Sequence, residues 1–227
     1  MESSRTYVLK KPPRGFTLVE MLVVLAIIVI VTGIAINGQS SFNKTVILTD
    51  TAYTLAFSIR EAQSLGLSSR LFNGIQNAAY GVHFSNATTI TNYTLFADTN
   101  PASPGSSQGG VCPGHTVSSG PEAKPGNCTY DVPTEAVRTS TFNRGFKISK
   151  FCGFDTALNA TRCSGTNLDS LDIVYLRPNT QSIITGKRSG APMALENATI
   201  YVASPDGGTE RCVSVSKVGQ VSVGVCP

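Results

Sequence analysis

An apolar run of 21 residues, from Phe16 to Ile36, constrains this chain most strongly, because Glu20 is its only charged residue. As an α-helix the run would be roughly 31 Å long, close to the thickness of a bilayer core. Residues 1–15 carry four basic side chains against one acidic side chain, a net charge of +3. Such a positive flank remains in the cytoplasm. We therefore expect residues 16–36 to form a transmembrane helix, with the C-terminal bulk outside the cytoplasm.

The carboxylate of Glu20 within the apolar run distinguishes this segment from a plain membrane anchor. The run is longer than the apolar core of a secretory signal, and no clear small-residue cleavage site follows it. A plain anchor fits the length but leaves Glu20 unexplained, since a carboxylate in the bilayer costs about 2.5–3.5 kcal/mol on insertion scales. That cost favours a functional role. The alternative is that Glu20 lies near the helix end and reaches water.

The segment Gly15-Phe16-Thr17-Leu18-Val19-Glu20 resembles the processing site of type IV pilins and type II secretion pseudopilins. In that family a prepilin peptidase cuts after the glycine and methylates the new N-terminal phenylalanine. The resemblance implies a leader peptide over residues 1–15, cleavage between Gly15 and Phe16, and Glu20 as the assembly acid that neutralises the N-terminal amine of a neighbouring subunit. A buried charge pair of this kind is better suited to setting register than to adding stability.

Composition limits what the exported part can be. Residues 37–227 are numerous enough for one globular domain with its own core. The leader supplies +3 of the overall charge of +4, so the remaining chain is close to neutral. Net charge therefore gives no support for a domain that binds nucleic acid strongly.

All six cysteines lie in the presumed exported part, where an even number favours disulfides. Pairing sequence neighbours is our hypothesis among several possible connectivities: Cys112–Cys128, Cys152–Cys163 and Cys212–Cys226. The last pair has the best support, because a hairpin about Lys217-Val218-Gly219 brings its cysteines within about a residue of directly opposite. Zinc is the competing interpretation, but no C-x₂-C pair exists and neither His83 nor His115 has ligand spacing.

The helix is expected to continue beyond the apolar run. Small and apolar residues recur at steps of three and four and form one stripe: Leu48, Ala52, Leu55, Ala56, Ile59, Ala62 and Gly66. Residues 37–66 are thus predicted to be an amphipathic continuation that packs on the domain. The polar stretch 37–43 between the two halves is a place for a bend.

From residue 79 onward the pattern indicates β-structure. Strands are predicted at 80–84, 89–96, 136–142, 146–151, 171–176, 181–185 and 198–203, before the terminal hairpin. Turn residues predict a hairpin between the first two strands and a second one about Asn143-Arg144-Gly145. Residues 98–130 are rich in proline and glycine and are predicted to be a long loop.

These elements predict an α+β fold of the pilin type. A long N-terminal helix, with its transmembrane and amphipathic halves, packs on a globular β-rich domain over residues 67–227 that has an antiparallel sheet and disulfides. Two segments further resemble the GspH/FimT group of minor subunits. They are the helix segment Leu55-Ala-Phe-Ser-Ile-Arg60-Glu-Ala62 and the C-terminal segment Arg211-Cys-Val-Ser-Val-Ser-Lys-Val-Gly219-Gln220-Val221. Gln220 stands where that group commonly has arginine.

We find no enzyme signature, because the chain lacks a G-x-S-x-G elbow, an H-E-x-x-H motif and a P-loop. No catalytic residue, cofactor or metal is expected. His83 is interpreted as a sheet residue and His115 as a solvated loop residue. Asp169 and Asp172 could serve as calcium ligands, although the EF-hand pattern is absent.

Five basic residues fall close together in the sequence, opposed by Asp155 and interleaved with phenylalanines: Arg138, Arg144, Lys147, Lys150 and Arg162. Cations beside aromatic rings can hold a nucleic-acid strand through phosphate contacts and stacking. Some minor pilins of the related group bind DNA, largely through their C-terminal segment, where this chain has only Arg211 and Lys217. A solvated face with the phenylalanines in the core is the favoured interpretation.

The sequence therefore predicts a non-enzymatic minor pilin or pseudopilin of a type IV pilus or a type II secretion filament. Its expected partners are other pilin subunits, prepilin peptidase, the inner-membrane assembly platform, and membrane lipid before assembly. It is expected to be a single-pass inner-membrane protein with a cytoplasmic N-terminus, and then part of a surface or periplasmic filament. The alternatives are a DNA-binding minor pilin and an anchored exported protein that never polymerises.

Overall fold

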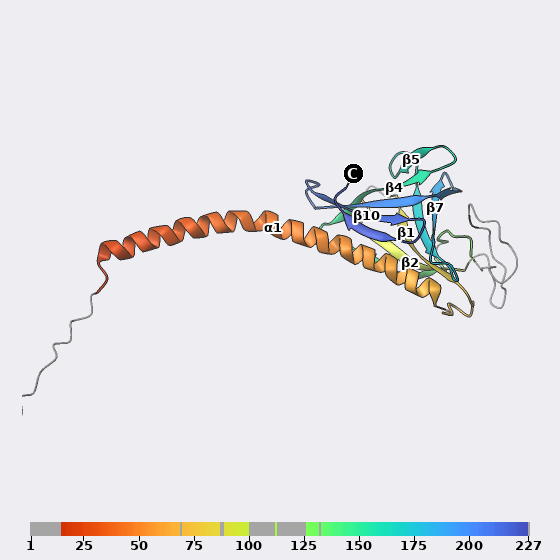
Figure 1. The fold of residues 1–227 in the computed structure, drawn as a ribbon, viewed down its shortest axis with the longest axis horizontal. Coiled ribbons are helices and arrows are strands. Elements are labelled where there is room, and N and C mark those ends of the chain that lie inside the picture. Colours follow the sequence, from red (N-terminus) through yellow and green to blue (C-terminus); the bar gives the residue numbers. More distant parts are fainter. Residues whose placement is uncertain are drawn as a thin grey trace, which may run out of the picture. The chain divides into compact units, whose positions relative to one another are not determined.

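The computed structural model describes residues 15–68, 70–86, 89–99, 112, 126–131 and 133–226, and for residues 35–42 it describes the backbone alone. The chain divides into two compact units, with the boundary between Asn43 and Lys44. One helix, α1 (Leu18–Leu67), occupies most of the described part of the first unit and the beginning of the second (Figure 1). The helix ends at Leu67, and the sequence analysis placed its end at residue 66.

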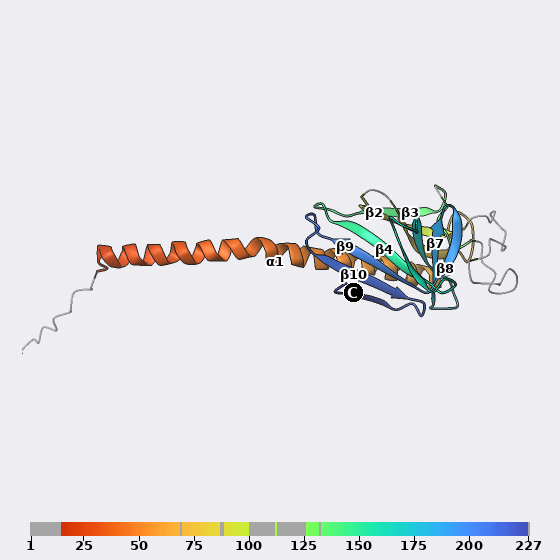
Figure 2. The same cartoon turned by 90° about the horizontal axis from the view of Figure 1, so that it is seen from above.

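The second unit contains two antiparallel sheets rather than the one that the sequence predicted. The first has six strands in the order β3-β2-β1-β6-β7-β8, and the second has five in the order β11-β10-β9-β4-β5. The strands of the first sheet are β1 (Ala79–Ser85), β2 (Asn92–Asp98), β3 (Ala136–Thr141), β6 (Ser170–Tyr175), β7 (Ser182–Arg188) and β8 (Ala191–Leu195). Those of the second are β4 (Lys147–Asp155), β5 (Ala160–Cys163), β9 (Asn197–Ala203), β10 (Glu210–Ser216) and β11 (Val221–Gly224), and Figure 2 shows β4, β9 and β10 side by side.

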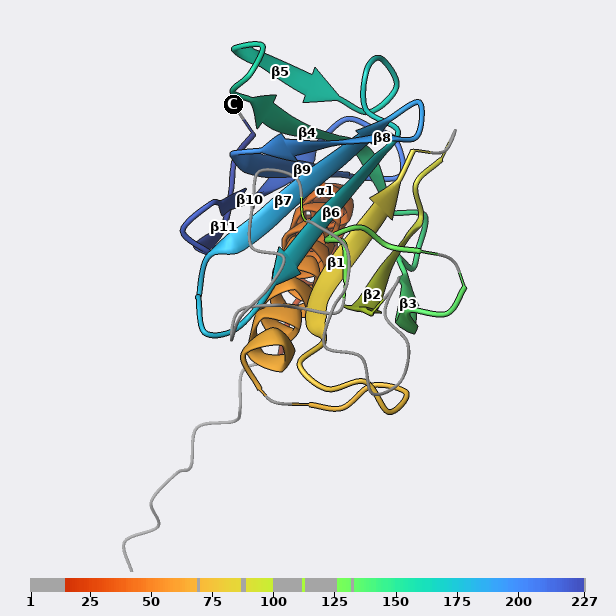
Figure 3. The same cartoon turned by 90° about the vertical axis from the view of Figure 1, so that its right-hand side faces the viewer.

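The predicted apolar stripe of the helix is the centre of the core. Leu48, Ala52, Leu55, Ile59 and Ala62 are fully buried. They share one cluster with inward-facing residues of both sheets, among them Phe84 and Ile173 of the first and Ile200 and Val213 of the second. Figure 3 shows this part of α1 flanked by strands of both sheets. The i, i+3, i+4 spacing thus reports a face that is buried against β-structure.

The end of the helix approaches the first sheet closely. A Cβ atom on Gly66 would lie 2.2 Å from the carbonyl oxygen of Tyr175 in β6. Because that oxygen belongs to the backbone of a central strand, it cannot move aside as a flexible side chain would. Glycine is therefore required here by the approach of two backbones.

The first predicted hairpin is confirmed, since β1 pairs with β2 in antiparallel register. The second is wrong, because β3 joins the first sheet and β4 joins the second. The tight turn does form, with positive φ at Arg144 and Gly145. It carries the chain from Phe142, whose ring lies 5.5 Å from that of Tyr93, across to the second sheet. Turn residues specify a reversal of the chain but not which sheet edge the next strand joins.

Two strands escaped the sequence analysis, and both give weak patterns. β5 has only four residues, and β8 contains Pro192 next to Ala191. Both lie at sheet edges, where proline and short length are tolerated. The predicted loop over 98–130 lies mostly outside the described residues.

Candidate functional site

The predicted processing segment stands at the start of α1. Gly15, Phe16 and Thr17 precede the helix, and Phe16 is 77% exposed. A Cβ atom on Gly15 would meet no atom within 4 Å. Packing within the described residues therefore does not explain why glycine stands here. Residues 1–14 of the predicted leader lie outside the described part of the chain.

Thr17 caps the helix, which the sequence analysis did not foresee. The backbone N–H of Glu20 donates to Thr17 Oγ1 at 3.3 Å, and the N–H of Met21 donates to the Thr17 carbonyl at 3.2 Å. Thr17-Leu-Val-Glu20 matches the T-x-x-E pattern of a capping box, a signal that was legible in the sequence. Glu20 lies in the first turn, where a negative charge complements the helix dipole. Its position thus has a local structural reason besides the predicted role in assembly.

Beyond Glu20 the helix is apolar on every side as far as Ile34, with Thr32 the one polar side chain. Large hydrophobic residues from Leu18 to Ile34 are all at least 45% exposed within this chain. A helix without a polar face is normally covered by other apolar groups. No helical segment among the described residues combines the length and the hydropathy of a membrane span.

The structure contains three disulfides, and each joins the pair favoured by the sequence. Cys152 and Cys163 lie directly opposite each other in β4 and β5, with Cα atoms 4.1 Å apart. Cys112 bonds to Cys128, and Cys212 to Cys226. The terminal pair is more offset than predicted, because Gly224 is the residue opposite Cys212.

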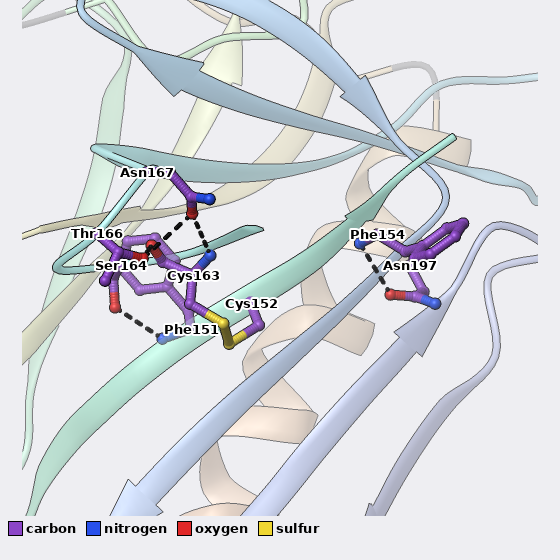
Figure 4. The surroundings of a disulfide bond; sticks show 8 residues. All are labelled: Phe151, Cys152, Phe154, Cys163, Ser164, Thr166, Asn167 and Asn197. Atoms are coloured by element: carbon purple, nitrogen blue, oxygen red, sulfur yellow. Dashed lines mark hydrogen bonds between the residues drawn. A yellow bond between two sulfur atoms is a disulfide. The ribbon is translucent and has the colours of Figure 1, made fainter. Parts of the chain in front are cut away.

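Side chains hold the backbone around the Cys152–Cys163 bond in place (Figure 4). The N–H of Cys163 donates to Asn167 Oδ1 at 2.8 Å, and the N–H of Phe151 donates to Ser164 Oγ at 3.0 Å. Asn197 Oδ1 accepts from the N–H of Phe154 at 3.3 Å. The bond is thus part of a structural hairpin.

The five basic residues do not form one surface. Arg162 is buried and its Nε donates to Asp155 Oδ2 at 2.7 Å. The guanidinium of Arg138 makes a bidentate contact with Glu61 of α1, with its shorter bond at 2.6 Å. Two of the five cations are therefore already neutralised within the fold.

The remaining cations are dispersed as well. Lys150 Nζ lies 4.3 Å above the ring centroid of Tyr201, and Arg144 is exposed in the turn before β4. Phe146 and Phe151 are buried in the core and Phe142 is half-buried, so these rings do not form an exposed stacking platform. The phenylalanines thus lie in or against the core, as the favoured interpretation expected, but the cations do not form the single solvated face that it also expected.

Asp155 is held in its charged form by its surroundings. The Arg162 guanidinium that donates to it, with the backbone N–H groups of Leu158 and Ala157, keeps the pKa of Asp155 below its ordinary value, although burial opposes this. The pair also links the two strands of the β4–β5 hairpin. Arg162 is thus a structural residue.

His83 lies in β1 as predicted, but it has a partner that the sequence did not reveal. Its Nδ1 lies 2.6 Å from Oδ1 of Asp172, which stands opposite it in β6 and is fully buried. The ring of Tyr130 covers His83, with centroids 4.8 Å apart. His115 lies outside the described residues. Asp169, the other predicted calcium candidate, accepts from the N–H of Ser189.

One group of possible metal ligands occurs among the described residues. Atoms of Asp98, Cys112 and Cys128 lie within 4.8 Å of one another. The two sulfur atoms are joined in a disulfide, so neither is a thiolate ligand. The Asp98 carboxylate accepts from the N–H groups of Asn127 and Cys128, which fixes the base of the disulfide loop.

Residues 10–36 match the family described as the prokaryotic N-terminal methylation motif. No curated protein and no solved structure matches the chain. The matched segment contains the basic end of the predicted leader, the glycine at the predicted cut and the apolar run. It supports a pilin-like N-terminus that is processed by prepilin peptidase, and anchoring of the chain at that end.

Proposed function

We propose that the chain is a structural subunit, without enzymatic activity, of a type IV pilus or a type II secretion pseudopilus. The observation that carries the proposal is the methylation motif at residues 10–36, which overlaps the start of a helix with exposed large hydrophobic residues. Prepilin peptidase cuts after Gly15 and methylates Phe16. The subunit then moves from the inner membrane into the filament with the help of the assembly platform.

The unexplained glycine and the exposed helix support this role. Gly15 has no packing reason within the described chain, whereas a peptidase that binds the extended backbone would require a small residue there. The apolar side chains from Leu18 to Ile34 need a cover, which lipid supplies before assembly and like helices supply afterwards.

Glu20 has two candidate roles that can be separated by experiment. Glutamine at the third helical position serves a capping box as well as glutamate does. Glu20→Gln therefore keeps the cap on α1 but removes the charge that would neutralise a neighbour's amine. Thr17→Ala does the reverse, because it removes the cap and keeps the charge.

The test expresses each variant with the other subunits of its filament system and measures processing and filament incorporation separately. We expect Glu20→Gln to be cut and methylated at Phe16, to remain in the membrane, and to be lost from sheared filaments. Incorporation of Glu20→Gln at the wild-type level would refute the assembly role. N-terminal sequencing that finds an uncut chain in wild-type membranes would refute the whole proposal.

We further propose a minor subunit of the GspH/FimT group. The support is the helix segment Leu55–Ala62 and the terminal hairpin, in which β10 and β11 flank a turn with φ of +86° at Gly219. A DNA-binding role is not favoured, because Arg138 and Arg162 are engaged in ion pairs.

A further inference from the structure

A polar groove of about 430 Å³ lies between α1 and the edge of the first sheet. Its size is within the range of about 300–1,000 Å³ that is typical of small-molecule sites. Half of its lining residues are serine, threonine or asparagine: Thr51, Thr54, Ser58, Ser140, Thr141 and Asn143. Neither the predicted processing site nor the proposed filament role uses these residues.

The walls of the groove are held apart by specific contacts. The bidentate contact between Arg138 and Glu61 fixes the distance between β3 and α1. The hydroxyl groups of Ser58 and Tyr93 lie 2.9 Å apart and join the helix to β2 at the floor. Because these contacts are made within the folded chain, a ligand would find its binding groups already positioned.

The groove has little net charge. Asp50 and Arg144 both line it, and within the described part of the chain neither forms an ion pair. Their charges oppose each other, and the charge of Arg138 is neutralised by Glu61. The half-buried ring of Phe142 adds one apolar wall.

We propose that this groove binds a short neutral saccharide. A sugar presents a dense set of hydroxyl groups. The hydroxyls of Thr51, Thr54 and Ser58 donate to carbonyl groups of α1 and can therefore accept from a sugar, whereas the hydroxyl and amide groups on the sheet side of the groove can also donate. The ring of Phe142 can cover the apolar face of a pyranose, while Asp50 and Arg144 supply the stronger, charge-assisted hydrogen bonds at the mouth. The inference goes beyond the filament role, because it assigns a ligand to the globular unit.

Other ligand classes fit the lining less well. A nucleic acid needs an excess of positive charge, which the groove lacks. A lipid tail needs an apolar lining, whereas Ile47 and Phe142 are the chief apolar contributors among the lining residues. An extended peptide would pair with a sheet edge chiefly through its backbone, so it would make little use of the side chains that line the groove.

The test measures binding of the full chain, in detergent, to a glycan array of neutral di- to tetrasaccharides of glucose, galactose and N-acetylglucosamine. Heparin, single-stranded DNA and an unstructured peptide are the comparison probes. We expect at least one neutral saccharide to bind, with affinity nearly unchanged between about 50 and 500 mM NaCl, since no phosphate or sulfate contacts contribute.

Three variants locate the binding. Thr54→Tyr fills the groove from the exposed face of α1, and Ser64→Tyr places the same side chain on an exposed helix position that does not line it. Asn143→Ala removes an amide from the rim without altering the helix. We expect Thr54→Tyr and Asn143→Ala each to weaken binding at least about tenfold, and Ser64→Tyr to leave it unchanged.

Three outcomes would overturn the proposal: binding to no saccharide on the panel, binding to heparin or DNA alone with a steep dependence on salt, or binding to the peptide alone. Equal loss of affinity in Thr54→Tyr and Ser64→Tyr would place the saccharide outside the groove. None of these outcomes bears on cleavage at Gly15, so the filament role is judged separately.

Discussion

Replacement of Arg162 tests whether the basic residues serve structure or ligand binding. Its side chain is 10% exposed, that of Asp155 is 7% exposed, and the two groups are 2.7 Å apart. Arg162→Met leaves a buried carboxylate without its counter-ion, which costs about 3 kcal/mol, the lower end for a buried pair. In a domain of this size that loss lowers Tm by about 6–12 °C. Thermal unfolding of the full chain, followed by circular dichroism under non-reducing conditions, measures it.

The chain offers a matched control for this prediction. Arg138→Met makes the same substitution at an ion pair whose side chains are 50% and 36% exposed, so we expect a loss of at most about 1 kcal/mol. The double variant Arg162→Met with Asp155→Asn should regain part of the lost stability, because no uncompensated charge then remains buried. Equal, small effects of Arg162→Met and Arg138→Met would refute the argument and return Arg162 to the list of candidate ligand contacts.

Three further predictions concern stability. Arg162 and backbone amides depress the pKa of Asp155, so the stability that this group contributes is present above about pH 4 and is lost as pH falls through its lower folded pKa. The urea midpoints of wild type and Asp155→Asn should therefore differ at neutral pH and converge at acid pH. Gly66→Ala should destabilise the domain by about 1–3 kcal/mol in urea unfolding, since its Cβ meets the Tyr175 carbonyl oxygen, and an unchanged midpoint would contradict the close approach. The double variant Cys152→Ala, Cys163→Ala should lose about 2–3 kcal/mol of stability, because its unfolded chain is no longer restricted by that cross-link. A reductant should then lower the stability of the variant less than that of wild type.

The signals that start the N-terminal helix are all present in the sequence, although the sequence analysis overlooked the cap. These signals are local: a run of apolar residues, a cap at Thr17 and an acid three positions later. Such local patterns predict structure reliably, because residues at i, i+3 and i, i+4 are neighbours in any helix. The buried stripe from Leu48 to Ala62 was predictable for the same reason.

Disulfides between sequence neighbours were also within reach of the sequence. Cys152 and Cys163 are 11 residues apart and flank a single hairpin, so the chain between them leaves little choice of partner. The strands β5 and β8 were missed because β5 has only four residues and the five residues of β8 include a proline, so neither shows enough alternation to predict a strand.

The sequence by itself determined the methylation motif, the helix stripe and the reversals of the chain, because each depends on residues that are near neighbours along the chain. Only the tertiary structure decided that β3 and β4 belong to different sheets, that Arg138 meets Glu61, and that His83 meets Asp172. These pairs are 77 and 89 residues apart, and the partner of each group depends on how two sheets pack around one helix. Local propensity carries no record of such packing, and the polar groove beside α1 exists only as its result.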